Sequence, residues 1–167
     1  MMTLNDLPLA TALALGLLTA YLAGSIPSAV WIGKSFYGVD VREKGSGNAG
    51  TTNILRTVGK KAAALTLLCD ILKGVVSILI AIIVGKFAKQ VSPAILVELA
   101  ALFVVIGHTF PIFFEFRGGK GVATSLGVIL LINWKIGLIC LVFGIILIAI
   151  TRMVSLGSIT AAILLPI

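Results

Sequence analysis

A long charge-free stretch near the N-terminus most constrains how this chain can fold. Residues 7–33 are 27 positions without Asp, Glu, Lys or Arg, whereas about 20 apolar residues suffice for a helix to cross a bilayer. Pro27 lies inside this stretch and removes a backbone hydrogen bond, which predicts a kink. Because 59% of all residues are hydrophobic and 11% are charged, against about a quarter charged in soluble domains, we expect an integral membrane protein.

Further apolar runs follow along the whole sequence. They cover residues 62–85, 94–114, 121–134, 136–151 and the segment after Ser155. Between Lys120 and Lys135 there are only 14 uncharged residues, about 21 Å of helix against a bilayer core of about 30 Å. To span the bilayer, a helix over this run has to include flanking residues or cross where the bilayer is thinned. Otherwise it enters the bilayer without crossing it. We therefore expect an all-α polytopic bundle of about six transmembrane helices, some short or broken, in one membrane-embedded domain over residues 1–167.

Polar residues gather in residues 42–56, which we call the first glycine loop. Its three glycines allow positive φ and a close approach to a ligand, its hydroxyl and amide side chains offer donors, and Arg42, Lys44 and Arg56 add positive charge. Successive backbone N–H groups in such a loop form an anion site, which a following helix strengthens. The alternative is a flexible polar connector, which does not require glycines interleaved with amides between cations. We predict a phosphate site.

A second glycine loop, residues 117–124, repeats this chemistry with an Arg fork, a Lys point charge and three glycines. The Lys and Arg count places both loops on one side of the membrane. Segments 34–61, 115–121 and 151–155 hold nine basic residues, whereas the intervening loops hold three. Under the positive-inside rule, both glycine loops are expected to face the cytoplasm.

Asp70, Lys73 and His108 lie inside apolar runs. Asp70 and Lys73 are three apart, so they share a helix face and can pair; the pair is either functional or a structural ion pair that locks two helices. His108 is near a helix end, where it is either a satisfied structural group or a base.

Cys69 and Cys140 have no partner at metal spacing, and we expect no cofactor or metal. Despite a net charge of +7, there is no basic tail or aromatic ladder to favour nucleic-acid binding.

Five motifs occur together and in order. They are Gly24-Ser-Ile-Pro-Ser28, Gly45-Ser-Gly-Asn-Ala-Gly-Thr-Thr-Asn53, Asp70-Ile-Leu-Lys-Gly74, Gly107-His-Thr-Phe-Pro111 and Gly118-Gly-Lys-Gly-Val-Ala-Thr124. With them the chain closely resembles the bacterial acyl-phosphate:glycerol-3-phosphate acyltransferases (the PlsY type). The resemblance implies a multi-pass enzyme of the bacterial inner membrane with a cytoplasmic active site. It implies acyl transfer from acyl phosphate to the 1-hydroxyl of sn-glycerol 3-phosphate, which gives lysophosphatidic acid and phosphate in phospholipid biosynthesis.

By matching position, the resemblance implies catalytic roles for Ser46, Arg56 and Lys120. Substrate-binding roles are expected for Gly45, Gly47, Asn48, Gly50, Thr52, Asn53, His108, Gly118, Gly119, Gly121 and Ser155. The acyltransferase signature of a His with an Asp five positions later is absent, because Phe113 follows His108 at that spacing. We therefore hypothesise that no acyl-enzyme forms and that a substrate phosphate oxygen takes the hydroxyl proton.

The resemblance also implies a seventh helix and a basic segment containing His-Arg-Glu-Asn after the position of Ile167, which this sequence lacks. Expected partners are the two phosphate substrates and the lipid bilayer, without nucleic acid, and the protein is expected to be monomeric. A transporter or channel for an organic phosphate remains the alternative function. Its support is the intramembrane pair of Asp70 and Lys73 and the broken helices.

Overall fold

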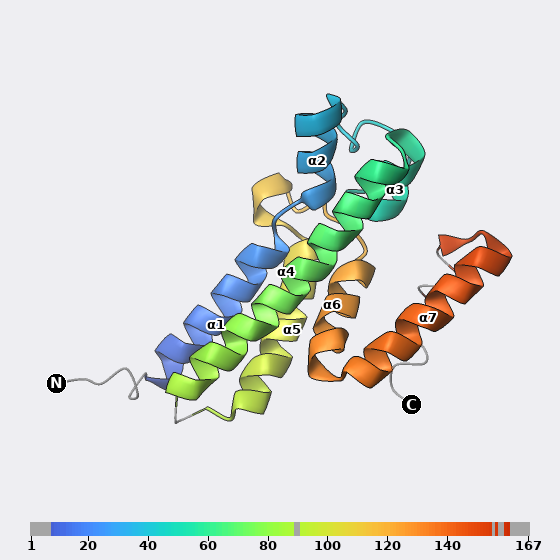
Figure 1. Ribbon diagram of the computed structural model, residues 1–167. Helices are drawn as coiled ribbons and strands as arrows, with labels where there is room; N and C mark the ends of the chain where they lie inside the picture. Colours follow the sequence, from blue (N-terminus) through green and yellow to red (C-terminus); the bar gives the residue numbers. More distant parts are fainter. Residues whose placement is uncertain (1–7, 89–90, 155, 157–158, 161–167) are drawn as a thin grey trace.

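The computed structural model describes residues 8–88, 91–154, 156 and 159–160, and the regular structure of this part is helical (Figure 1). The helices are α1 (Leu9–Gly24), α2 (Ser28–Tyr37), α3 (Thr51–Thr57), α4 (Lys60–Phe87), α5 (Pro93–Thr109), the 3-10 helix η1 (Ile112–Phe114), α6 (Val122–Ile132) and α7 (Trp134–Thr151). The expected all-α fold is confirmed.

Helix α4 is the axis of the bundle. It packs against α1, α5 and α6, and also against α2 and α3. Figure 1 shows α4 running through the middle of the molecule, with α2 and α3 together at one end. Helix α7 packs mainly on α6 and otherwise stands apart. The long central helix therefore connects α2 and α3 at one end with the bundle of α1, α5 and α6.

Glycines allow the helices to cross at backbone contact distance. Gly24 of α1 and Gly107 of α5 each face a backbone carbonyl oxygen of the other helix, so a Cβ at either position would collide with it. Gly74 of α4 and Gly127 of α6 form the equivalent crossing between their helices. Small residues at such contacts let membrane helices approach closely. Three of the motif glycines, Gly24, Gly74 and Gly107, thus serve packing.

The charge-free N-terminal stretch forms two helices instead of one. Helix α1 ends at Gly24, α2 begins at Ser28, and their axes are bent by 41°. Pro27 precedes the first residue of α2, so the predicted kink is confirmed. The missing proline N–H explains why the helix breaks here.

Three described helical segments are long and apolar enough to span a membrane, namely α4, α5 together with η1, and α7. The bent pair α1 and α2 makes a fourth candidate. Helix α6 has 11 residues, about 16 Å, which is too short to cross alone. The expected number of about six included α6 and the apolar run after Ser155, and most of that run lies outside the described residues.

Two apolar clusters form the core. One lies among α1, α4 and α5 and includes Ala20, Ile78 and Leu96. The second fills the space between α2, α3 and the start of α4. It consists of Ala29, Val30, Ile32, Val41, Ala49, Ile54, Ala62 and Ala63. Because it includes Ala49 of the first glycine loop and Val41 just before it, this second cluster fixes the loop to the bundle.

Candidate active site

Asn53 closes the first glycine loop. Its side-chain Oδ1 accepts a hydrogen bond from the backbone N–H of Ser46 at 3.0 Å, while Nδ2 donates to the carbonyl oxygens of Val41 at 2.7 Å and Lys44 at 3.1 Å. The residue is only 2% exposed. One buried amide therefore holds three points of the loop backbone, and its donors are not free for a ligand.

Two glycines of this loop adopt the left-handed conformation. Gly45 has φ +62° and Gly47 has φ +69°, a conformation that glycine permits at no steric cost. A Cβ on Gly45 would collide with the Oδ1 of Asn53, so the amide can reach the loop only where that side chain is absent. Gly50 is different: it has φ −126° and precedes the first residue of α3 in an extended conformation. The sequence allows positive φ at all three glycines, and Gly50 does not use this freedom because a helix begins directly after it.

Four predicted site residues of the first loop keep exposed surface. Ser46 and Arg56 are exposed, and Asn48 and Thr52 are half-buried. Arg56 lies in the last turn of α3. These side chains are accessible to a soluble anion, in contrast to Asn53.

The second glycine loop lies on the C-terminal end of α5. The backbone N–H of Gly118 donates to the carbonyl oxygen of Thr109 at 3.1 Å, and that of Gly119 donates to His108 at 3.0 Å. A Cβ on Gly118 would collide with the His108 carbonyl oxygen, and one on Gly119 with the Nε2 of His108. These two N–H groups bind α5, so any anion contact of the loop backbone comes from residues after Gly119. Gly121, with φ +77°, immediately precedes α6.

Both loops line one pocket, which is too narrow in this structure to admit a water molecule. Ala49 comes from the first loop, Gly118 and Gly119 come from the second, and Lys73 and His108 come from α4 and α5. The wall is completed by Gly24, Ile26, Pro27 and Pro111. The break between α1 and α2 thus faces the same space as the two loops. Of the predicted site residues, His108, Gly118 and Gly119 line the pocket, whereas Ser46, Asn48, Thr52, Arg56 and Lys120 do not.

A buried charged group lies at this pocket. The Nζ of Lys73 is 2.9 Å from the Oδ1 of Asp70 and donates to the carbonyl oxygen of Ile26 at 3.0 Å. The predicted pairing of Asp70 with Lys73 is confirmed. The Nδ1 of His108 is 3.6 Å from the same Asp70 oxygen, beyond hydrogen-bond distance. All three side chains are nearly inaccessible to solvent.

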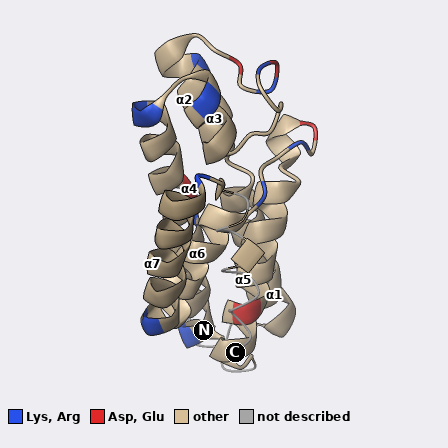
Figure 2. Cartoon of the chain, turned by 90° about the vertical axis from the view of Figure 1, so that its right-hand side faces the viewer, with Lys and Arg blue, Asp and Glu red and all other residues tan. Residues whose placement is uncertain are grey.

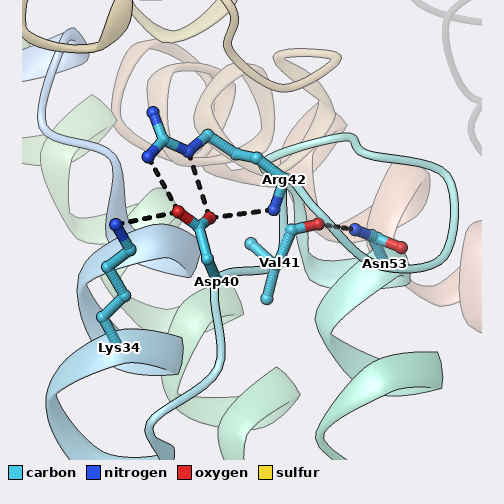
Figure 3. Close-up of polar contacts among 5 residues, drawn as sticks. All are labelled: Lys34, Asp40, Val41, Arg42 and Asn53. Atoms are coloured by element: carbon cyan, nitrogen blue, oxygen red, sulfur yellow. Dashed lines mark hydrogen bonds and ion pairs between the residues drawn. The ribbon is translucent and has the colours of Figure 1, made fainter.

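One charged residue was not singled out from the sequence. The carboxylate of Asp40 accepts hydrogen bonds from Arg42 through Nη2 at 2.8 Å, Nε at 3.1 Å and the backbone N–H at 3.0 Å, and from the Nζ of Lys34 at 2.8 Å (Figure 3). Arg42 and then Lys34 hold the pKa of the Asp40 carboxyl far below its ordinary value, and Asp40 raises the pKa of Arg42. The surplus of Lys and Arg around a single Asp is the signal that could have identified it.

Lys and Arg residues gather at the end of the molecule that carries α2 and α3, with fewer at the opposite end (Figure 2). Lys120 and Arg56 are exposed, and within the described ranges neither forms an ion pair. Ser155 lies outside the described residues. In the part of the chain that the structure describes, no group of three or more His, Cys, Asp or Glu side chains could hold a metal ion.

Comparison with known proteins identifies the family. A family model described as "Glycerol-3-phosphate acyltransferase" matches residues 14–167, nearly the whole chain. The chain belongs to the glycerol-3-phosphate acyltransferase family. A glycerol-3-phosphate acyltransferase of Clostridioides difficile is 49% identical over 143 residues, which cover 84% of this chain and 68% of the relative. One of Fusobacterium nucleatum is 48% identical over 147 residues, which cover 88% of this chain and 73% of the relative.

Solved structures agree with this assignment. The chain is similar to PlsY, an integral membrane glycerol 3-phosphate acyltransferase, in its glycerol 3-phosphate form, with a TM-score of 0.79 and 40% identity. The match covers 90% of this chain and 72% of that one. A lysophosphatidic acid form of PlsY matches with a TM-score of 0.76 and 38% identity, over 90% and 72% of the two chains. The protein is therefore an integral membrane protein of a bacterial acyltransferase family, as the sequence predicted.

Proposed function

We propose that this protein transfers a fatty acyl group from acyl phosphate to the 1-hydroxyl of sn-glycerol 3-phosphate. The products are lysophosphatidic acid and inorganic phosphate, and the reaction belongs to phospholipid biosynthesis. Family membership and the two forms of PlsY, named for glycerol 3-phosphate and lysophosphatidic acid, support the acceptor and the product. The observation that carries the proposal is the convergence of both glycine loops on one pocket.

Two phosphate groups have to be brought together, and they repel each other. Arg56 and Lys120 are exposed cations without an ion-pair partner among the described residues, which makes them available to neutralise substrate charge. Arg offers a planar fork and Lys a point charge, and both suit phosphate oxygens. We assign these two side chains to charge neutralisation, with Ser46, Asn48 and Thr52 as hydrogen-bonding groups around them.

In the proposed site, the first turn of α6 supplies the backbone N–H groups that bind phosphate. Helix α6 has 11 residues, Gly121 lies just before it, and the N–H groups of its first turn have no partner within the helix. Such a terminus favours an anion through its N–H groups and its dipole. Lys120 lies next to it in the chain. In this assignment Gly118 and Gly119 shape the loop against α5, and residues 120–123 contact phosphate.

The proposed chemistry is direct transfer. The 1-hydroxyl oxygen attacks the carbonyl carbon of acyl phosphate, and the bond from that carbon to the phosphate oxygen breaks. The departing phosphate keeps the electron pair, and a substrate phosphate oxygen takes the hydroxyl proton. Orientation of the two reactants supplies about 7–11 kcal/mol in favourable cases, and the cations stabilise the leaving phosphate. Trapping an acyl group on Ser46 in a single turnover would contradict this scheme.

We place the site at the cytoplasmic face of the bacterial inner membrane. Support comes from the excess of Lys and Arg in the segments that carry the glycine loops. This placement gives a soluble phosphate access from the cytosol, while the acyl chain stays in the bilayer.

The deciding experiment measures phosphate release in detergent micelles. Purified protein is given palmitoyl phosphate with and without glycerol 3-phosphate, and palmitoyl-CoA replaces the donor in a parallel reaction. We expect phosphate and lysophosphatidic acid only when palmitoyl phosphate and glycerol 3-phosphate are both present. Transfer from palmitoyl-CoA alone would overturn the donor assignment. A transporter would release no phosphate in micelles, because it needs a sealed compartment.

A further inference from the structure

Three charged residues, Lys34, Asp40 and Arg42, form an ion-paired cluster that the proposed chemistry does not use. We call it the Asp40 cluster. The Asp40 side chain is 8% exposed, and it holds Arg42 through both the guanidinium and the backbone N–H. A two-point contact of this kind fixes the direction of the Arg side chain.

The guanidinium of Arg42 reaches the segment that leads into the second glycine loop. Its Cζ lies 5.1 Å from the centre of the Phe114 ring, within the range of a cation–π contact. Phe114 is the last residue of η1 and precedes Arg117, the first residue of the second loop, by three positions. The Arg42 side chain thus contacts η1, the short helix just before the second glycine loop.

The backbone of the same residue belongs to the first glycine loop. A Cβ on Gly47 would lie 3.1 Å from the Arg42 carbonyl oxygen, so the turn at Gly47 folds directly over it. The carbonyl oxygen of Val41, one residue earlier, accepts the hydrogen bond from Asn53 (Figure 3). Arg42 is therefore part of the first loop through its main chain, and its side chain contacts η1, which leads into the second loop.

We propose that Asp40 is a positioning residue of the acyltransferase site, an inference that rests on the proposed function. By fixing Arg42 against Phe114, Asp40 sets the spacing between the two glycine loops and so between the two substrate phosphates. Because Asp40 compensates the charge of Arg42, this cation organises protein instead of binding substrate. Lys34 pairs with the same carboxylate but does not bridge the loops, so it provides a matched control.

The first test measures the spacing directly and needs no activity. Spin labels are attached at Glu43→Cys and Arg117→Cys, both exposed positions, after the two native cysteines have been replaced by alanine. The distance distribution is measured by electron paramagnetic resonance. Asp40→Asn is expected to broaden the distance distribution or to shift it to longer distances. Lys34→Gln is expected to leave it close to that of the parent. An unchanged distribution in Asp40→Asn overturns the proposal.

The second test measures acyl transfer with varied glycerol 3-phosphate. Asp40→Asn and Phe114→Leu are each expected to lower kcat/KM by about ten- to a hundredfold, the range that small misplacement causes. The kcat/KM of the double variant is expected to be no lower than that of the less active single variant, because both changes remove the same connection. If the two losses of kcat/KM multiply in the double variant, the proposal is overturned. If Asp40→Asn does not fold, Arg42→Lys replaces it, since Lys keeps the charge but lacks the planar fork.

The two tests separate the inference from the function on which it rests. A parent protein without acyl transfer would remove the proposed function, and the spin-label distances would still decide whether Asp40 sets the spacing. A parent with full activity, combined with wild-type distances in Asp40→Asn, would remove only the inference.

Discussion

The ammonium of Lys73 lies 3.0 Å from the carbonyl oxygen of Ile26, at the break between α1 and α2. Pro27 lacks the N–H that would continue the helix, so carbonyl groups near the break need other donors. Lys73 supplies one and at the same time pairs with Asp70 at 2.9 Å. A buried ion pair thus stabilises an interrupted helix, and Lys73, Ile26 and Pro27 all line the pocket.

Replacing Lys73 by Met should therefore destabilise the fold. Lys73→Met leaves the Asp70 carboxylate buried without its cation, which typically costs about 3–5 kcal/mol. The double variant Asp70→Asn with Lys73→Met removes both charges and should recover part of this loss. Unfolding in detergent, followed by circular dichroism, measures both effects. Equal stability of Lys73→Met and wild type would show that the pair contributes nothing.

Asn53→Leu should collapse the first glycine loop. The change removes the partner of three backbone groups at Val41, Lys44 and Ser46, and each group left buried without a partner costs about 1–3 kcal/mol. We expect loss of acyl transfer together with faster proteolysis within residues 42–50. As a control, Thr57→Val removes only a hydroxyl bond to the Asn53 carbonyl and should change the cleavage rate little. A protease-resistant Asn53→Leu loop would contradict the closing role.

Gly119→Ala should impair activity for a steric reason. The added Cβ meets the Nε2 of His108, so either the second glycine loop or the imidazole has to move. Gly144→Ala in α7 is the matched control, because nothing lies within 4 Å of its Cβ position and Ala is the better helix former by about 1 kcal/mol. Kinetics and thermal unfolding are measured on both variants. Similar activity in the two would mean that His108 and Gly119 are not tightly packed.

Removing either exposed cation of the site should lower turnover without unfolding the protein. For Lys120→Ala and Arg56→Ala we expect a loss of about a hundredfold or more in kcat, as for other groups that stabilise developing charge. Lys86→Ala, near the other end of α4, should keep wild-type rates. Near-wild-type rates in both site variants would rule out charge neutralisation by these residues.

The Asp40 cluster predicts a specific pH dependence of stability. Because the pKa of Asp40 is lowered in the folded protein, its contribution is complete above the unfolded pKa of about 3.9 and declines as pH falls toward the folded pKa. The difference in melting temperature between wild type and Asp40→Asn should therefore be constant from about pH 5 to 8 and shrink below about pH 4. A difference that changes across the neutral range would mean that another group titrates with Asp40.

Features governed by local chain chemistry could be predicted from the sequence. The kink at Pro27 follows from a missing N–H, and the pairing of Asp70 with Lys73 follows from their spacing of three on one helix. In each case the partners lie a few residues apart, within the reach of pattern rules.

The site differs from the sequence expectation where groups are held by partners that no helix or strand periodicity relates to them. Asn53 looked like a ligand donor, but its amide is used by the loop backbone. Gly118 and Gly119 looked like an anion cradle, but their N–H groups bind the end of α5. The Asp40 cluster takes its role from the contact of Arg42 with Phe114, which lies 72 positions later in the chain. Tertiary packing decides each of these roles.

The hydrogen bonds of Asn53 join residues only 7, 9 and 12 positions apart. Contacts over such short separations form early and need no later part of the chain. The pocket, by contrast, is lined by residues from Gly24 to Gly119, so it exists only after most helices have been inserted. During synthesis the first glycine loop can therefore take its shape while the protein is still unable to react with substrate.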